Sequence, residues 1–297
     1  MKDGAKDSMR SDVRSGMKSG MKSGVRSGMT RAGFLAGAVL TAALLLAALL
    51  SLVWTPWPPE QIDMARRLAA PSPAHWLGCD QLGRDVLSRL MAGARSAWLV
   101  GLVAVGIGLL AGTALGLVAA ARRGAVEALI LRGADLGYAF PALLLAILLA
   151  AALGPGMTVA MAAIGLHAVP SFARLVNGSA KSWWARDFVL AARVAGQGRW
   201  AITLRHVLPQ LLPLLVVQGT TSFALAILAE AGLSYLGLGT QPPQASWGRL
   251  LAEAQTLMFE APQLALAPGL AITLAVLGLN LLGDGLRDRL DPKELPR

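Results

Sequence analysis

The residues best suited to acid–base chemistry gather in HWLGCDQLGRDVLSRL, residues 75–90. A histidine such as His75 beside Asp80 or Asp85 could act as a general base. The local candidate for a nucleophile, Ser88, lies in an ordinary helical pattern and not on the strained strand-to-helix turn of a nucleophile elbow. We therefore expect a structural role, in which the charged residues of this stretch form local ion pairs: Asp80, Arg84, Asp85 and Arg89.

Other residue types with useful chemistry are sparse. Cys79 is the single cysteine, which excludes an intramolecular disulfide and a cysteine-rich metal site, and the three histidines lie far apart in sequence. We predict no metal site, no cofactor and no catalytic residue. His167 falls inside a long apolar run, where an ionisable side chain is a candidate for contact with a ligand. A neutral imidazole bonded to a neighbouring helix explains the same sequence equally well.

The composition is that of a polytopic membrane protein. Of the 297 residues, 55% are hydrophobic and 15% are charged, and the mean hydropathy is +0.56. A soluble domain carries about 25% charged residues. The net charge of +10 does not indicate a nucleic acid partner, because the basic residues collect at the ends of apolar runs. We predict an all-α fold with six transmembrane helices.

Six uncharged runs supply these helices. The first, 33–53, would span about 31 Å as a helix, and it is longer than the apolar core of a signal peptide. The break Gly154-Pro155-Gly156 divides a longer uncharged stretch into two spans joined by a tight turn. Gly108, Gly112 and Gly116 share one face of the second run, which predicts a close helix contact. The predicted spans are 33–53, 97–121, 136–153, 157–173, 207–229 and 261–283.

Basic residues are unequally divided between the two sides that six spans define. One side holds eight Lys and Arg in 1–32, three in 122–132, six in 174–205 and four after 284. The other side holds five in 54–96 and one in 230–260. The positive-inside rule therefore places the tails, 1–32 and 284–297, in the cytoplasm and the segment 54–96 in the periplasm. Cys79 should then react with an impermeant thiol reagent from outside.

The basic tail 1–32 repeats Gly, Ser and single basic residues, as in RSGMKSGMKSG. No apolar face can form from this pattern, so we expect the tail to be disordered. Contact of its basic residues with anionic membrane lipid is the alternative to a merely solvated tail.

The most distinctive segment is DFVLAARVAGQGRWAITLRHVLP, residues 187–209, a charged stretch between two apolar runs. Its apolar spacing predicts a short helix over 188–195, with Asp187 as N-cap and Gly196 as the left-handed residue after the helix. A second helix should follow and enter the next span near Pro209, where a missing N–H is tolerated. We interpret the short helix as an element that a partner protein pushes; an amphipathic connector is the alternative.

This segment resembles the EAA loop in the permease subunits of bacterial ABC importers, in which EAA is followed by a glycine and then by Ile and Leu-Pro. The matching residues are Ala191, Ala192, Gly196, Ile202, His206, Leu208 and Pro209, whereas Leu190 stands in place of the usual Glu. Three further segments resemble the dipeptide, oligopeptide and nickel permeases: HWLGCDQLGRDVLSRL, SYLGLGTQPPQASWG and NLLGDGLRDRLDP. In the first of them Cys79 replaces the usual Thr.

The resemblance implies a MetI-like permease core at 97–283 in the bacterial inner membrane. Its partners would be a second permease, two ABC ATPase subunits and a periplasmic substrate-binding protein. The resemblance assigns ATPase coupling to Leu190, Ala191, Ala192, Gly196, Ile202, Leu208 and Pro209. Polar residues of the spans that could contact the solute are His167, Gln218, Thr221 and Asn280. ATP hydrolysis must come from the partners, because the chain has no GxxxxGK[ST] phosphate loop.

The solute implied is a di- or oligopeptide, and nickel or another metal chelate is the alternative within the same architecture. An ion-coupled secondary transporter is disfavoured, because such carriers place carboxylates or cations inside their spans and the uncharged runs leave none. A membrane-embedded enzyme would need paired catalytic groups at membrane depth, where only His167 lies.

Overall fold

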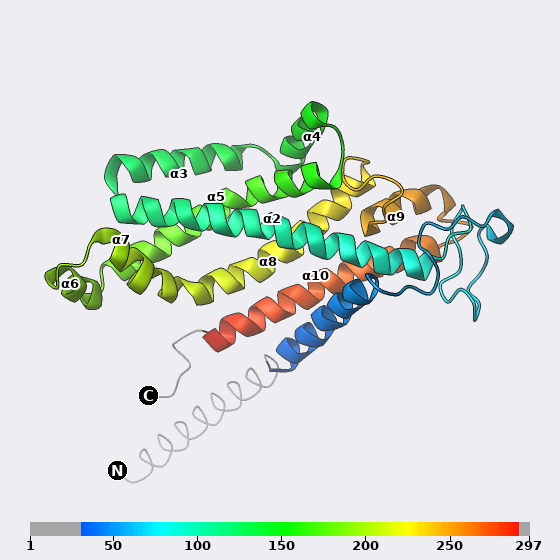
Figure 1. Ribbon diagram of the computed structural model, residues 1–297, viewed down its shortest axis with the longest axis horizontal. Helices are drawn as coiled ribbons and strands as arrows, with labels where there is room; N and C mark the ends of the chain where they lie inside the picture. The colour runs from blue at the N-terminus through cyan, green and yellow to red at the C-terminus, as the bar shows by residue number, and fades with distance from the viewer. Residues whose placement is uncertain (1–30, 291–297) are drawn as a thin grey trace, which may run out of the picture.

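The computed structural model describes residues 31–290, and all regular structure in this range is helical (Figure 1). The predicted all-α fold is therefore confirmed. Most of the predicted disordered tail and the last seven residues lie outside the described range. The helices are Arg31–Leu50, α2 (Val86–Arg122), α3 (Gly124–Ala139), α4 (Ala142–Leu153), α5 (Met157–Trp184), α6 (Asp187–Val194), α7 (Arg199–Ile202), α8 (Leu208–Tyr235), α9 (Trp247–Ala254) and α10 (Gln263–Leu290). Short 3-10 turns occupy Met64–Arg66 and Gln255–Leu257, and a π-helical segment occupies Thr203–Val207.

Five helices are long and apolar enough to cross a membrane: Arg31–Leu50, α2, α5, the continuous helix Arg199–Tyr235 and α10. The sixth candidate is the pair α3 and α4, which bend by 84° at their junction. The six predicted spans correspond to these five helices and this bent pair.

The predicted third span, 136–153, has the wrong bounds. Its helix begins at Gly124 and stops at Phe140, whose backbone is extended (φ −88°, ψ 116°). The next residue is Pro141, and a proline both lacks an N–H and disfavours the helical conformation of the residue before it. The following helix, α4, has 12 residues. At about 18 Å it is too short to cross a bilayer core alone.

The second span is longer than predicted, because α2 runs without interruption for 37 residues. Asp85 caps its start, where the side chain accepts the N–H of Ser88 at 2.8 Å. The residues 86–96, expected to belong to a separate periplasmic segment, are therefore the first turns of α2. Likewise α5 continues to Trp184, so the first part of the charged stretch after 173 is helical.

The close helix contact predicted from the glycines of α2 is confirmed, and the partner is α5. A Cβ on Gly108 would lie 2.6 Å from the Cβ of Ala168, and a Cβ on Gly112 would lie 2.5 Å from that of Phe172. Gly116 faces α5 in the same way, because a Cβ on it would lie 2.6 Å from the carbonyl oxygen of Ala173. Such small residues let two helices pack closely in lipid, where hydrophobic burial gives little driving force.

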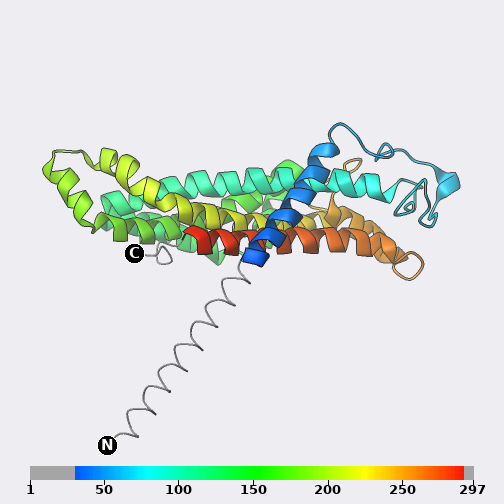
Figure 2. The same ribbon diagram turned by 90° about the horizontal axis from the view of Figure 1, so that it is seen from below.

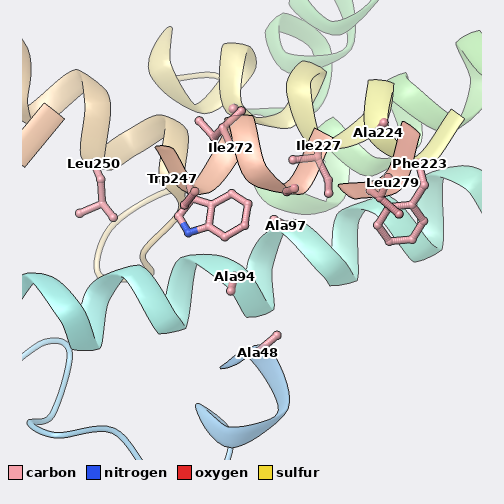
Figure 3. Close-up of a cluster of buried hydrophobic side chains, with 13 residues drawn as sticks. Ala48, Ala94, Ala97, Phe223, Ala224, Ile227, Trp247, Leu250, Ile272 and Leu279 are labelled. Carbon is pink, nitrogen blue, oxygen red and sulfur yellow. The ribbon is translucent and has the colours of Figure 1, made fainter. Parts of the chain in front are cut away.

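A second packed region surrounds Trp247 of α9. Its side chain is 1% exposed, and its Nε1 donates to the carbonyl of Leu90 at 2.9 Å. Figure 3 shows the ring beside Ala94 and Ala97 of α2, with Ile227 of α8 nearby. The cluster also includes residues of the first helix and α10, and Figure 2 shows the first helix crossing both α2 and α10 obliquely. This region holds one end of the helix bundle together.

Candidate functional site

The short predicted helix exists as α6, which protrudes at one end of the bundle between α5 and α7 (Figure 1). It begins one residue earlier than expected. Arg186 has the extended backbone of an N-cap, with no side-chain capping bond, and Asp187 is the first helical residue. The prediction of Asp187 as N-cap is therefore wrong, although a carboxylate in the first turn still favours the helix through its dipole.

The end of α6 matches the prediction for Gly196, whose φ is +77°. The N–H of Gly196 donates to the carbonyl of Arg193 at 3.0 Å, and the N–H of Gln197 donates to that of Ala192 at 3.1 Å. These two bonds form a Schellman motif, which requires a left-handed residue at the glycine position. The motif fixes the direction in which the chain leaves α6.

The second predicted helix begins at Arg199 and continues into the span as one helix to Tyr235. The π-helical segment Thr203–Val207 lies at the entry to the span. Pro209, which follows it, has no N–H to donate to the carbonyl of Arg205, and this lost bond is a local reason for the irregular turn. From α6 to the membrane the helical structure is interrupted at one place, the joint at Gly196–Gly198.

One face of α6 is anchored and the other is exposed. Val189 is 0% exposed and Ala192 is 8% exposed. Both pack in a cluster with Trp184 of α5, Ile202 of α7 and Leu211 of α8. The opposite face is apolar and open: Leu190 is 60% exposed and Val194 is 84% exposed, and Ala191 and Gly196 are also exposed. Leu208 is half-buried and Pro209 exposed. An exposed apolar face on a helix between spans is the kind of surface that a partner protein covers.

The four residues considered for solute contact are not gathered in one place. Gln218 and Thr221 line the same cavity of about 590 Å³ between α5, α8 and α10. His167 lies elsewhere on α5, with its ring edge-on to Tyr138 at 6.4 Å between centroids, and its buried Nδ1 has no hydrogen-bond partner among residues 31–290. Asn280 is exposed on α10 and does not line that cavity.

A buried carboxylate in α8 is not among the residues predicted from the sequence. Glu230 is 1% exposed, and its Oε1 accepts from Ser234 Oγ at 2.6 Å and from Thr240 Oγ1 at 3.2 Å. Ser234 Oγ also accepts the N–H of Thr240 at 2.9 Å. The spacing of Glu230 and Ser234 on one helix face was the available signal. The span therefore does contain one carboxylate, and it ties the loop after α8 to the helix.

Asp80 forms the predicted ion pairs with Arg84 and Arg89, which share a partner from α9, whereas the carboxylate of Asp85 pairs with His75 and with neither arginine. Asp80 Oδ2 accepts from Arg84 Nε and from Arg89 Nη1, each at 2.7 Å. Glu253 accepts from Arg84 at 2.9 Å, from Arg89 at 2.7 Å and from Arg249 at 3.2 Å. Burial by itself raises the pKa of Glu253, but the hydrogen bond from Arg89 and the three positive charges outweigh burial and hold the pKa below its ordinary value.

The same segment does not form a serine–histidine–aspartate triad. His75 Nδ1 lies 2.9 Å from Asp85 Oδ1, and Ser88 Oγ donates to Asp85 Oδ2 at 2.7 Å, so the serine contacts the carboxylate and not the imidazole. His75 Nε2 lies 2.6 Å from Arg66 Nη1. Because a guanidinium only donates, this nitrogen acts as an acceptor and is not available to a serine proton. These contacts tie the segment 66–88 together, which agrees with the structural role expected from the sequence.

Cys79 is 0% exposed, and burial, followed by the charges of Asp85 and Asp80, raises the pKa of its thiol. The thiolate is the form that reacts with thiol reagents. The expectation that Cys79 reacts readily from outside is therefore wrong, because the side chain is covered on every side.

Comparison with known proteins decides the family. Residues 112–295 match the family described as the binding-protein-dependent transport system inner membrane component. The chain belongs to this family. Similar proteins include the glutathione transport system permease protein GsiD of Pectobacterium atrosepticum, 44% identical over 78% of this chain and 77% of that protein. The dipeptide transport system permease protein DppC of Alkalihalophilus pseudofirmus is 43% identical over 77% and 75%. The probable D,D-dipeptide transport system permease protein DdpC of Escherichia coli is 40% identical over 82% and 83%.

The protein is thus a permease subunit of a binding-protein-dependent ABC importer, a multi-pass component of the inner membrane. The matched residues include the end of α2 and everything from α3 to α10. The matched region includes the segment from α6 to the start of α8. It also includes Gln218 and Thr221, which line the cavity between α5, α8 and α10.

Proposed function

We propose that this permease imports di- or oligopeptides together with a second permease subunit, two ABC ATPase subunits and a periplasmic substrate-binding protein. The observation that carries the proposal is α6, a capped helix between spans with an exposed apolar face. Membership of a binding-protein-dependent family supports a binding protein as a partner. The names of the relatives, which refer to dipeptides and glutathione, support a peptide as the solute.

In this proposal the ATPase holds the exposed face of α6, made by Leu190, Ala191 and Val194. The buried face, with Val189 and Ala192, packs on side chains of α5 and α8. A displacement of α6 is therefore transmitted to the ends of both spans without new contacts. Leu190 replaces an acidic residue at this position of the EAA pattern, so the contact with the ATPase is apolar here.

We propose further that both termini and α6 are cytoplasmic. The distribution of Lys and Arg supports this orientation, and the segment 54–85 and α9 lie at the opposite end of the bundle from α6 (Figure 1). The side chain of Trp76 is 68% exposed. The variant Trp76→Cys should therefore react with an impermeant thiol reagent in cells whose inner membrane is intact. Reaction that requires permeabilisation of that membrane would invert the orientation.

The solute is tested by uptake into proteoliposomes that contain the assembled transporter and its binding protein. A labelled dipeptide should accumulate with ATP, and labelled nickel should not; the reverse result would select the metal-chelate alternative. Gln218 and Thr221 are our candidates for contact with the solute, because they share one cavity. Substitution of either should raise the KM for the dipeptide, and an unchanged KM would remove them from the pathway.

Replacement of Gly196 by valine should uncouple ATP hydrolysis from dipeptide uptake. A left-handed backbone costs a residue with a Cβ about 1–2 kcal/mol, and a β-branched residue tolerates it least. No atom lies within 4 Å of the Cβ position, so the effect acts through the backbone and not through a clash. The control is Gly196→Asn, because asparagine tolerates this conformation. Equal uptake by the two variants would contradict the role of the Schellman motif.

A further inference from the structure

A cavity of about 540 Å³ lies where the ends of α2 and α5 meet α6 and α7. Four arginines line it: Arg122 and Arg123 from the end of α2, Arg193 from α6 and Arg199 from α7. None of the four forms an ion pair with a carboxylate within the range 31–290. Four like charges around one hollow repel each other, and an anion between them removes this repulsion.

A second, independent feature of this cavity is an unpaired buried donor. Trp184, the last residue of α5, lines the cavity and is 6% exposed. Its buried Nε1 has no hydrogen-bond acceptor in the described part of the chain. A buried N–H without a partner is costly, so such groups normally find an acceptor. The guanidinium of Arg193 lies over the indole ring, 5.1 Å from its centroid, which holds both groups at the same wall.

We propose that this cavity binds a phosphate group, either in the headgroup of an anionic phospholipid or as free inorganic phosphate. Guanidinium groups pair with phosphate oxygens in a bidentate manner. The indole N–H of Trp184 is covered by protein atoms, so it reaches a further oxygen only after a small movement of the side chains around it. All four arginines are exposed, so a phosphate would replace water at their donors, and it has several acceptor oxygens to offer them. The volume is sufficient for a phosphate together with part of a headgroup.

The position of the arginines gives this site a consequence for coupling. Arg122 and Arg123 close α2, whereas Arg193 and Arg199 flank the joint at Gly196–Gly198. A phosphate held by both pairs therefore bridges a transmembrane helix and the joint, and restrains α6. This consequence depends on the coupling role proposed above, but the binding itself does not.

The test uses the assembled transporter without ATP, so that binding is measured independently of coupling. One arm places it in nanodiscs of phosphatidylcholine with or without phosphatidic acid and counts retained lipids by native mass spectrometry. The other arm measures binding of radiolabelled inorganic phosphate by equilibrium dialysis. We expect one saturable site per permease in at least one arm, and the arm in which it appears identifies the source of the phosphate.

The double substitution Arg193→Gln/Arg199→Gln should weaken this binding roughly tenfold or more, because it removes two charge-assisted contacts. Trp184→Phe retains the ring but lacks the N–H, and should weaken it by a smaller factor. The matched control is Arg132→Gln/Arg205→Gln, which removes two exposed arginines that do not line the cavity. Saturable binding in neither arm, or equal weakening by the control, would overturn the proposal. If α6 never contacts the ATPase but the transporter still binds phosphate at this cavity, the binding site is supported and only its role in coupling is rejected.

Discussion

Replacement of Gly112 by leucine should leave little folded permease in the membrane. A Cβ at this position would lie 2.5 Å from the Cβ of Phe172 and 2.6 Å from the carbonyl oxygen of Val169. The second neighbour is backbone, so a rotamer change cannot relieve the overlap and α2 must move away from α5. Overpacking costs about 1–3 kcal/mol, and we expect this site at or above the upper end because the longest helix contact of the bundle is opened.

The control for this prediction lies on the same helix. Gly106 has no atom within 4 Å of its Cβ position, so Gly106→Leu changes the same residue type without an overlap. Thermal unfolding in detergent, followed by size-exclusion chromatography, should show a large loss for Gly112→Leu and little or none for Gly106→Leu. Equal midpoints for the two variants would show that α2 and α5 do not pack as described.

Replacement of Glu253 by leucine should lower the free energy of unfolding by about 3–5 kcal/mol, the usual cost of leaving a buried charge unpaired. The affected region is the end of the bundle that lies away from α6. Glu253 and Asp80 are the two carboxylates that balance Arg84, Arg89 and Arg249. With Glu253 removed, Asp80 alone remains against three guanidinium groups, and Arg89 is only 2% exposed. Urea or thermal unfolding of the purified permease measures the loss.

The pH dependence distinguishes a lost charge from lost packing. Because the folded state holds the pKa of Glu253 below its ordinary value of 4.5, its contribution is complete above that pH and disappears as the pH falls through the folded-state pKa. The wild-type protein should therefore lose stability faster than Glu253→Gln on acidification below about pH 4.5, while Glu253→Gln is less stable at neutral pH. Parallel profiles for the two proteins would contradict the ion cluster as the cause.

Local signals in the sequence were sufficient to locate five of the six spans and the end of α6. Runs without charge identify helices in lipid, because an unpaired charge is costly there. Gly196 was predictable because a helix often ends at a left-handed glycine. The bend at Pro141 was also predictable from the sequence, since a proline disfavours the helical conformation of the residue before it, here Phe140. The uniform apolar character of 136–153 instead favours one helix.

Contacts between distant residues were not predictable from one sequence. Glu253 lies 164 residues after Arg89, and nothing in either local pattern indicates the other. The same holds for the cavity beside α6, whose arginines come from two stretches that are separate in sequence, 122–123 and 193–199. The burial of Cys79 likewise depends on how the segment 54–85 folds over the end of α2, which no periodicity encodes.

Site-directed crosslinking tests most directly whether an ATPase subunit holds α6. A photo-crosslinking residue placed at Leu190, which is 60% exposed, should form a covalent product with the ATPase in membranes that contain the full transporter. The same residue at Leu236, 55% exposed at the far end of α8, is the control and should form none. If Leu190 gives no ATPase product above the level at Leu236, the coupling role of α6 is contradicted.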